Sequence, residues 1–362
     1  MESIGGFLEE GSLDSRPHLY LNGRMGAMKR WQFWLGLFIS LVFLYFALRG
    51  LRLEDMGMAL KQAQYWWLVP GVFVYFLGVW VRTWRWHFLL APIKSIRILR
   101  LFPIVAIGYM GNNIYPARMG EVLRAVILKR TDEVPISASL ATIIVERIFD
   151  GVVMLAFVFL NLGELARLTT DSGVVGNIQT VALWGTIAFL GALLIFLAAA
   201  MFPQRTIALT RKFVQLVIPG RYQDIFIGFA ERFLEGLESL RSPRDVLMVL
   251  LTTVVIWLFE TGKYWFVMHA FPFEVSYFAL MLMNGIVNLA TTIPSAPGYI
   301  GTFDAPGIAV LMAYGVDKAT AAAYTLVLHV ALWVPITALG LYFFLREGID
   351  WWQEVKEMQV GV

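Results

Sequence analysis

Long apolar segments recur along the whole chain and are separated by shorter polar stretches. A membrane-spanning helix needs about 20 apolar residues, with about 17–25 the usual range. Taken with their flanks, segments of suitable length lie at 33–49, 66–81, 136–162, 178–202, 246–270, 275–293 and 319–345. The pattern therefore predicts an all-α polytopic membrane protein.

Two further apolar segments, 101–115 and 303–315, are shorter and contain glycine. Each is typical of a re-entrant or broken helix, which ends at membrane depth where protein or a watery cavity satisfies its backbone. If 101–115 enters and returns while 303–315 crosses, the chain has about eight transmembrane helices. The pattern equally allows these two roles to be exchanged.

The composition agrees with this fold class. Hydrophobic residues make up 59% of the chain and charged residues 15%, whereas soluble domains carry about 25% charged residues. No cleavage site follows the first apolar run, so we expect a retained helix rather than a signal peptide. The net charge of +3 is small and dispersed, which argues against nucleic-acid binding.

Several kinds of chemistry are excluded or disfavoured. The sequence contains no cysteine, which excludes disulfides and thiolate metal sites. The four histidines, at positions 18, 87, 269 and 329, are not spaced as metal ligands. No nucleotide-binding loop is recognisable, so ATP-driven transport by this chain is not expected. We therefore expect no metal and no cofactor.

The positive charges indicate the orientation. In the eight-crossing arrangement, 22 of the 29 Lys and Arg residues fall on one side of the membrane and 5 on the other. Because cytoplasmic loops are enriched in Lys and Arg, both termini are predicted to be cytoplasmic, in the cell membrane. The chain then divides into a cytoplasmic segment at 1–30, a membrane domain at 31–346 and a cytoplasmic tail at 347–362.

The longest polar loop, 203–245, contains an amphipathic pattern. Apolar residues recur every four positions, with charged residues between them, at Ile225, Phe229, Phe233 and Leu237. This spacing predicts a helix with one apolar face on the cytoplasmic side. Packing against the end of the bundle and contact with the lipid surface are both consistent with it.

Two stretches break the apolar pattern at membrane depth. The first, 108–124, contains Pro116 and Gly120, and we expect these residues to act as a structural break or hinge. The second, 288–304, has a similar spacing from proline to glycine and contains Pro294, Pro297, Gly298 and Gly301. Paired broken segments in two halves of a chain are typical of inverted-repeat transporters, so a weak inverted repeat is a hypothesis here.

Charged residues directly follow the first break. Arg118, Glu121 and Arg124 are spaced by three, which places them on one side of a starting helix. Two guanidinium groups and the N–H groups of a helix start would form a cradle for a lipid phosphate. The alternative is a ladder of interfacial charges that reach toward the headgroups of the cytoplasmic leaflet.

More ionisable residues lie within the apolar segments, where each costs roughly 2.5–3.5 kcal/mol unless it is paired. Glu146, Arg147 and Asp150 occupy one segment, and their spacing allows Arg147 to pair with Asp150. The cluster either neutralises itself or faces a polar cavity in which Arg147 meets an anion. Glu260 and Lys263 can also pair with each other.

Three other features allow a structural and a functional interpretation. Asp304 could cap a helix or complement an arginine across a cavity. His329 is a lone histidine, which more often bonds a neighbouring helix than carries protons. Arg82 and Arg85 lie among tryptophans, a pattern typical of an anchor at the membrane interface.

These residues together resemble the flippase-like family built on the membrane region of lysylphosphatidylglycerol synthases. The resemblance spans about residues 30–346, although Tyr299 replaces a glycine and Asp304 a glutamate of the family pattern. The matching pieces are Arg82-Thr-Trp-Arg-Trp86, Asn113-Ile-Tyr-Pro-Ala-Arg-Met-Gly-Glu-Val-Leu-Arg124, Glu146-Arg-Ile-Phe-Asp150 and Pro294-Ser-Ala-Pro-Gly-Tyr-Ile-Gly-Thr-Phe-Asp304.

The resemblance implies an integral membrane lipid translocase. In the full synthases this region moves aminoacylated phosphatidylglycerol between leaflets, and a separate domain, for which this chain has no room, makes that lipid. A phospholipid or another phosphate-bearing lipid is therefore the expected partner. The expected substrate-binding residues are Asn113, Arg118, Glu121, Arg124, Glu146, Arg147, Asp150 and Asp304. The three arginines would bind phosphate, and the acids would balance them or bind a cationic headgroup.

Two other hypotheses stay open. Some proteins that resemble this family act in polyprenyl-phosphate sugar transfer, and Glu146 and Asp150 would then serve as acid and base groups. The chain could also be a non-catalytic partner of a separate lipid-modifying enzyme.

Overall fold

The structure, a computed structural model, describes residues 22–115, 118–168, 172–293 and 295–347, which form helices and turns without a strand. The longer helices are α1 (Asn22–Leu48), α3 (Leu68–Leu90), α6 (Ile136–Leu168), α7 (Ser172–Met201), α10 (Pro243–Met268) and α13 (Lys318–Arg346). The shorter helices are α2 (Leu53–Gln62), α4 (Ile98–Ile114), α5 (Met119–Asp132), α8 (Pro203–Val217), α9 (Gly220–Glu235), α11 (Tyr277–Ala290) and α12 (Asp304–Ala313).

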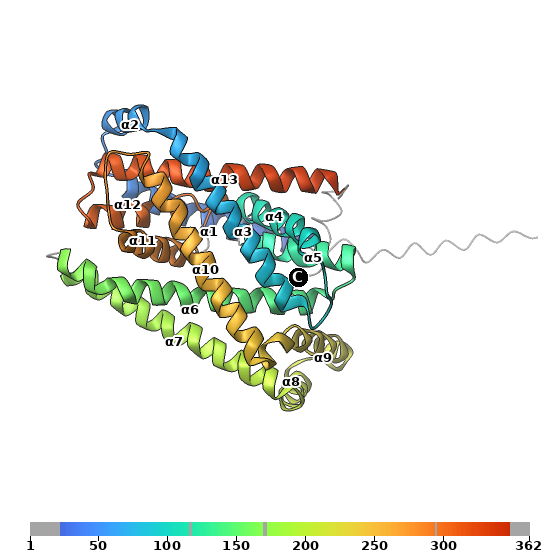
Figure 1. The fold of residues 1–362 in the computed structure, drawn as a ribbon. Helices are drawn as coiled ribbons and strands as arrows, with labels where there is room; N and C mark the ends of the chain where they lie inside the picture. Colours follow the sequence, from blue (N-terminus) through green and yellow to red (C-terminus); the bar gives the residue numbers. More distant parts are fainter. Residues whose placement is uncertain (1–21, 116–117, 169–171, 294, 348–362) are drawn as a thin grey trace, which may run out of the picture.

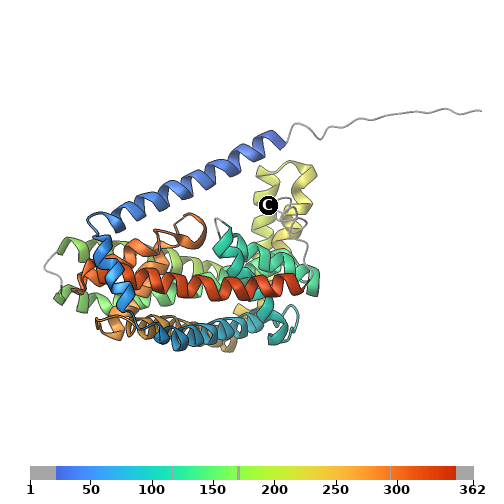
Figure 2. The same cartoon turned by 90° about the horizontal axis from the view of Figure 1, so that it is seen from above.

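The long helices run between two ends of one bundle (Figure 1). One end carries α2, and the opposite end carries α8 and α9; we call them the α2 end and the α8–α9 end. The first long helix, α1, lies along one side and leans away from the other helices over much of its length (Figure 2). The arrangement confirms the expected all-α polytopic membrane protein.

Helix length and composition support several crossings. Among the described residues, three helices are long and apolar enough to span a membrane, at 65–90, 243–268 and 318–346. Bends of 84° and 105° separate α1 from α2 and α7 from α8, and each bent pair would add one span. The charged α6 is 33 residues long, which at about 1.5 Å per residue also exceeds the thickness of the hydrocarbon core.

The first break in the apolar pattern is the tip of a helical hairpin formed by α4 and α5, which we call the first hairpin. Its two helices meet through glycines. A Cβ atom placed on Gly120 would overlap the carbonyl oxygen of Gly108, and one on Gly111 would lie 2.7 Å from the Gly120 Cα. Because real side chains do not tolerate such distances, glycine is required for this backbone contact. Gly120 thus lies inside α5 and packs two helices together, and its expected role as a hinge stays a prediction.

The second break is the tip of another hairpin, formed by α11 and α12, which we call the second hairpin. A short 3-10 turn, η4 (Pro297–Tyr299), lies between its helices. The backbone here is left-handed at Gly298 (φ 74°), Tyr299 (φ 60°) and Gly301 (φ 84°), which interrupts helical hydrogen bonding as the sequence predicted. Pro116 and Pro294, the other expected break residues, lie outside the described residues.

The two hairpins enter the bundle from opposite ends, the first from the α8–α9 end and the second from the α2 end (Figure 1). Their tips meet near the middle of α13. Asn113 donates to Thr337 Oγ1 at 2.8 Å, and the Gly298 carbonyl oxygen lies 2.7 Å from His329 Nε2. Across the tips, Arg118 Nη2 donates to the Thr291 carbonyl oxygen at 3.3 Å.

This arrangement differs from the expected path of the chain at 275–293 and 303–315. The helices there have 14 and 10 residues, about 21 and 15 Å, which is too short to cross a hydrocarbon core of about 30 Å. Both belong to one re-entrant hairpin because the left-handed residues between them turn the chain back. The opposite entry of the hairpins fits an inverted repeat, which itself stays a prediction.

The amphipathic loop at 203–245 forms a pair of helices, α8 and α9, at one end of the bundle. The expected apolar stripe is divided in its environment. Leu237 is buried, whereas Ile225 and Phe229 remain exposed. The C-terminal part of the stripe therefore packs against the bundle, and the N-terminal part remains uncovered in this chain.

Replacing Gly120 with alanine tests the contact inside the first hairpin. The new methyl group meets backbone atoms that cannot rotate away, so we expect Gly120→Ala to lower the free energy of unfolding by about 1–3 kcal/mol. Gly191→Ala in α7 is the control, because no atom other than nearby backbone of the same helix and the adjoining residues lies within 4 Å of its added Cβ. Thermal unfolding in detergent measures both, and equal melting temperatures would contradict this packing.

Candidate functional site

A network of buried charges joins α3, α5, α6 and α10. Asp150 of α6 is its centre. Its carboxylate lies 2.7 Å from Arg85 Nη1, 3.1 Å from Arg147 Nη2 and 3.4 Å from Arg82 Nη1. The indole Nε1 of Trp257 also donates to Asp150 Oδ1, at 3.1 Å. One carboxylate thus forms ion pairs with three guanidinium groups and accepts a hydrogen bond from a tryptophan, and its side chain is 3% exposed.

Glu146 is the second buried acid of α6, one turn before Asp150. Its oxygens lie 3.5 Å from Arg85 Nε and 3.1 Å from Arg124 Nη2. The Arg124 guanidinium also lies 3.9 Å from the centre of the Trp86 ring. Arg85 therefore bridges both acids of α6, and their common helix face, expected from their spacing, is confirmed.

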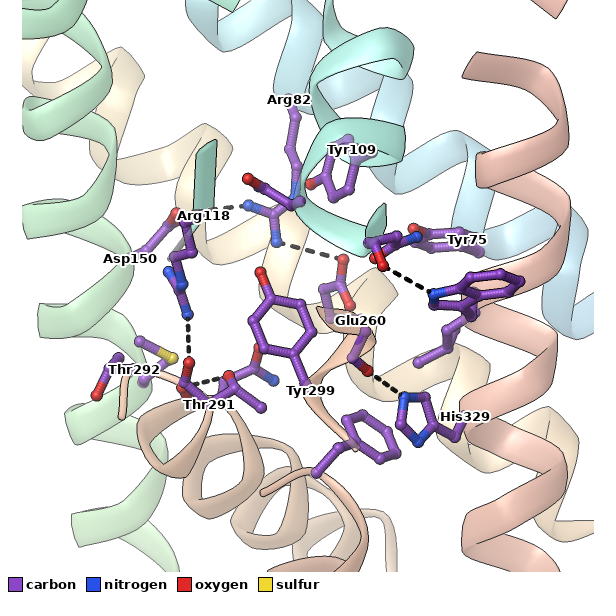
Figure 3. A pocket seen from close by; sticks show the side chains of 18 of the residues that line it. Tyr75, Arg82, Tyr109, Arg118, Asp150, Glu260, Thr291, Thr292, Tyr299 and His329 are labelled. Carbon is purple, nitrogen blue, oxygen red and sulfur yellow. Dashed lines mark hydrogen bonds and ion pairs between the residues drawn. The ribbon is translucent and has the colours of Figure 1, made fainter. Parts of the chain in front are cut away.

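Glu260 of α10 extends the network toward the second hairpin. It pairs with Lys263 of the same helix and lies 3.2 Å from Arg82 Nη2. Arg82 consequently connects Glu260 to Asp150, as Figure 3 shows. The expected pairing within α10 is confirmed, but it is only one part of a larger set of contacts.

A polar cavity of about 220 Å³ lies beside this network, at the point where the hairpin tips meet. Its charged lining consists of four cations, Arg82, Arg118, Arg147 and Lys263, and two acids, Asp150 and Glu260. The formal excess of two positive charges favours an anionic ligand. Side chains that can donate hydrogen bonds complete the polar lining, among them Tyr75, Tyr109, Asn112, Asn113, Asn288, Thr291 and Thr292.

Arg118 differs from the other arginines of the cavity. It is the left-handed residue (φ 55°) directly before α5. Its guanidinium contacts the Thr291 carbonyl oxygen and lies 5.8 Å from the centre of the Tyr299 ring. No described carboxylate lies within ion-pair distance of it, so its charge is available to a ligand in the cavity (Figure 3).

A second, apolar cavity of about 700 Å³ adjoins the first. It lies between α1, α12 and α13, and its lining includes Leu44, Leu48, Ile308, Leu326 and Val330. Four residues line both cavities: Asn113, Gly298, His329 and Trp333. The two spaces therefore share one boundary at the hairpin tips, with charge on one side and apolar side chains on the other.

His329 occupies this boundary. Its Nδ1 lies 2.9 Å from Asp304 Oδ1, and its Nε2 lies 2.7 Å from the Gly298 carbonyl oxygen. The other oxygen of Asp304 accepts from the Gly301 N–H at 2.8 Å. The expectation that His329 bonds a neighbouring segment is confirmed, and Asp304 complements this histidine rather than an arginine.

The structure brings only part of the expected substrate site together. Asn113, Arg118, Arg147 and Asp150 line the polar cavity, and Asp304 lines the apolar one. Glu121, Arg124 and Glu146 instead line a small void of about 30 Å³. This void shares Arg82, Tyr109, Asn112 and Arg147 with the polar cavity.

Arg124 does not line the polar cavity, so the expected convergence of three arginines on one phosphate stays a prediction for Arg124. The close glycine contact between α4 and α5 sets the rotation of α5, which turns Arg124 toward Glu146 and away from Arg118. Glu121 faces Arg147, with 3.6 Å between Oε1 and Nε.

Sequence reasoning also missed two central residues. Arg82 and Arg85 were assigned to an interfacial anchor, but they are 7% and 0% exposed, while the neighbouring Trp80 and Trp84 remain exposed. The spacing of residues in this segment did contain a signal that these arginines are buried. The buried positions Tyr75, Val79, Arg82 and Trp86 recur every three or four residues, so the core-facing stripe of α3 continues through the charges.

Metal binding finds no support in the described part of the chain. Within it, no three His, Cys, Asp or Glu side chains are grouped so that they could hold a metal ion. The acids of the network are instead occupied by guanidinium and ammonium groups.

Removing the charge of Asp150 tests the network. Asp150→Asn leaves three guanidinium groups, two of them buried, without their shared carboxylate, so we expect a loss of about 3–5 kcal/mol in the free energy of unfolding. Glu121→Gln is the matched control: its side chain is 20% exposed and meets one arginine at 3.6 Å, and we expect a loss below about 1 kcal/mol. Denaturation of the purified proteins in detergent compares them, and similar losses would contradict the central position of Asp150.

Comparison with known proteins identifies relatives of similar length. The chain is 24% identical over 263 residues to the UPF0104 membrane protein MJ1595 of Methanocaldococcus jannaschii, covering 71% of this chain and 77% of the relative. A UPF0104 membrane protein of Methanothermobacter thermautotrophicus is 24% identical over 295 residues, covering 77% and 83%. No solved structure gives a significant match.

A third relative is a larger protein. Glycosyltransferase AglD of Haloferax volcanii is 26% identical over 262 residues, which cover 65% of this chain and 41% of that protein.

The family described as the lysylphosphatidylglycerol synthase TM region matches residues 33–340, a range that includes both hairpins, the charge network and both cavities. This integral membrane protein belongs to the lysylphosphatidylglycerol synthase TM region family.

Proposed function

We propose that this protein moves a phosphate-bearing lipid between the leaflets of the membrane. The observation that carries the proposal is the shared boundary of a cationic polar cavity and a larger apolar cavity at the tips of two re-entrant hairpins. A lipid fits both spaces, because its charged headgroup suits the polar cavity and its hydrocarbon chain suits the apolar cavity.

The charge of the polar cavity favours a phosphate headgroup. Arg118 offers a guanidinium without a described carboxylate partner, and Arg147 lines the same space. Guanidinium groups bind phosphate through paired N–H donors and are the side chains most often used for this purpose. Aromatic and amide side chains around them can bind the hydroxyl groups of a headgroup alcohol.

The volumes of the two cavities also match the two parts of a lipid. At about 220 Å³ the polar cavity is smaller than the ~300–1,000 Å³ of sites that enclose a drug-sized ligand. It accommodates a headgroup without its chains. The apolar cavity, at about 700 Å³, then receives part of an acyl or polyprenyl chain, while the remainder stays in the bilayer.

A second candidate function is supported by the similarity to glycosyltransferase AglD. The chain spans less than half of that protein, and sugar transfer would require acid and base groups here. Glu146 and Asp150, the candidates for those roles, are both engaged by arginines, which disfavours proton transfer to a substrate. Formation of a glycolipid from polyprenyl phosphate and a sugar donor by the purified protein would favour this second function.

We also infer the orientation and the partners of the protein. The loops rich in Lys and Arg lie at the α8–α9 end, so we assign this end to the cytoplasm and the protein to the cell membrane. The first hairpin then enters from the cytoplasm and the second from outside. A separate lipid-modifying enzyme would then act as a partner on the cytoplasmic side.

Arg118→Gln tests the proposed phosphate site. Losing a charged hydrogen bond of about 1.5–3 kcal/mol should slow exchange of an anionic lipid at least about tenfold. Reconstituted vesicles containing fluorescent phosphatidylglycerol, phosphatidylcholine or polyprenyl phosphate measure the accessibility of each leaflet. We expect the folded protein to tolerate the change because Arg118 balances no described acid.

Arg244→Gln is the control for Arg118, since Arg244 is an exposed arginine of α10 outside both cavities. Its exchange rate should equal that of the unmodified protein. Equal rates in vesicles with and without protein, for all three lipids, would overturn the proposed function. An Arg118→Gln protein as active as Arg244→Gln would overturn the phosphate site.

Filling the apolar cavity tests the proposed place of the lipid chain. Leu326 lines this cavity and is 42% exposed, so the larger indole of Leu326→Trp should obstruct it and slow exchange severalfold. Leu341→Trp on the same helix is the matched control, because Leu341 is 45% exposed and lies outside the cavity. The same leaflet assay measures both, and equal rates would exclude this path for the chain.

A further inference from the structure

The contacts of His329 fix the number of protons that it shares with Asp304. A carbonyl oxygen has no hydrogen to donate, so Nε2 must carry a hydrogen and donate it to Gly298 at 2.7 Å. At the other ring nitrogen, Nδ1 and Asp304 Oδ1 are 2.9 Å apart. If neither carried a proton, two acceptors would face each other at hydrogen-bond distance.

The second contact therefore contains one ionisable proton. It resides on Nδ1, which gives an imidazolium beside a carboxylate, or on Oδ1, which gives a neutral imidazole beside a carboxylic acid. We propose that Asp304 and His329 form a proton-binding pair, and that occupancy of this pair is coupled to binding of an anionic lipid in the polar cavity.

The pair is built into the tip of the second hairpin. Asp304 Oδ2 accepts from the Gly301 N–H, and His329 Nε2 donates to the Gly298 carbonyl oxygen. Both glycines have positive φ. The proton thus completes a chain of contacts that fastens the hairpin tip to α13, and its loss replaces an attraction with a repulsion at Nδ1. Release of the proton loosens the boundary between the two cavities.

The surroundings of the pair let an anionic ligand influence its proton. The aromatic ring of Phe303 lies 4.5 Å from the imidazole ring, measured between centroids, and the segments of α1 and α2 that line the apolar cavity contribute no charge there. The polar cavity, which His329 also lines, is surrounded by titratable or charged groups from the remaining elements. These groups are Tyr75, Arg82, Tyr109, Arg118, Arg147, Asp150, Glu260, Lys263 and Tyr299.

These groups carry an excess of positive charge, which opposes the proton of the pair when the cavity is empty. A phosphate in the cavity offsets this charge and favours the proton. By linkage, a bound proton must then favour the phosphate to the same extent. This coupling rests on the proposed lipid-translocating function, whereas the existence of the proton-binding pair does not.

Asp304→Asn removes the ionisable proton of the pair and keeps its hydrogen bonds. The amide of asparagine can donate to an unprotonated Nδ1, so the connection between the hairpin tip and α13 is kept without an ionisable proton. Asp317→Asn is the control, since Asp317 is an acid at the N-terminal cap of α13 outside both cavities. His329→Gln assigns the signals of His329 among the four histidines.

The measurement combines nitrogen NMR of the ring with infrared detection of a protonated carboxyl, on the purified full-length protein between pH 5 and 9. We expect the wild-type protein and Asp317→Asn to lose one proton from the pair as the pH rises. Asp304→Asn should show neither an imidazolium at His329 nor a carboxylic acid at pH 6. A His329 signal that changes with pH in the same way with and without Asp304 would overturn the inference.

Proton uptake tests the coupling. Phosphatidylglycerol, added to protein in weakly buffered phosphatidylcholine nanodiscs, should cause uptake of up to one proton per wild-type protein and none with Asp304→Asn. Absence of uptake in the wild-type protein would overturn the coupling. Lipid exchange without a titrating pair would leave the proposed function intact, and a titrating pair without lipid exchange would reject that function while retaining the proton-binding pair.

Discussion

Charge pairing at membrane depth is the constraint on which this structure depends. An unpaired ionised side chain costs several kcal/mol inside an apolar bundle. This chain groups five cations and four acids, of which all but Arg147 and Glu121 are buried: Arg82, Arg85, Arg124, Arg147, Lys263, Glu121, Glu146, Asp150 and Glu260. Each acid contacts at least one cation on another helix. The network therefore fixes how α3, α5, α6 and α10 are rotated and placed relative to one another.

The glycines of the first hairpin make this pairing possible. Contact between Gly108 and Gly120 brings the backbones of α4 and α5 together, and this places Arg124 against Glu146 at 3.1 Å. A larger residue at Gly120 would displace α5 and, with it, one partner of a buried acid. Close backbone packing and charge neutralisation are thus two parts of one arrangement.

The sequence predicted the elements of this fold better than their connections. Hydrophobic segments, both breaks and the i,i+3 pairs of α6 and α10 depend on local spacing, and the structure contains them. The burial of Arg82 and Arg85 depends on acids 61 or more positions away, at Glu146, Asp150 and Glu260. No local pattern specifies such partners, and clusters of arginine and tryptophan more often lie at an interface.

The second hairpin also depends on features that local sequence patterns do not specify. The sequence indicated a break at 288–304, but segments on either side were apolar enough to be assigned as crossings. Their true lengths of 14 and 10 residues depend on left-handed backbone at Gly298 and Gly301. Likewise, the partnership of Asp304 with His329 spans 25 positions and arises only when α12 packs against α13.

Contact strength also differs between the network and the hairpin tips. Asp150 forms ion pairs with three arginines, two of them buried, and accepts a hydrogen bond from Trp257. At the hairpin tips, Asn113 and Gly298 are held to α13 by contacts of 2.8 and 2.7 Å. Between the two tips, Arg118 donates to the Thr291 carbonyl oxygen at 3.3 Å. Separating the two tips from each other therefore breaks a hydrogen bond with one charged partner, worth about 1.5–3 kcal/mol, whereas separating the helices of the network would leave several buried charges unpaired. The boundary between the cavities is therefore held by fewer charged contacts than the network is.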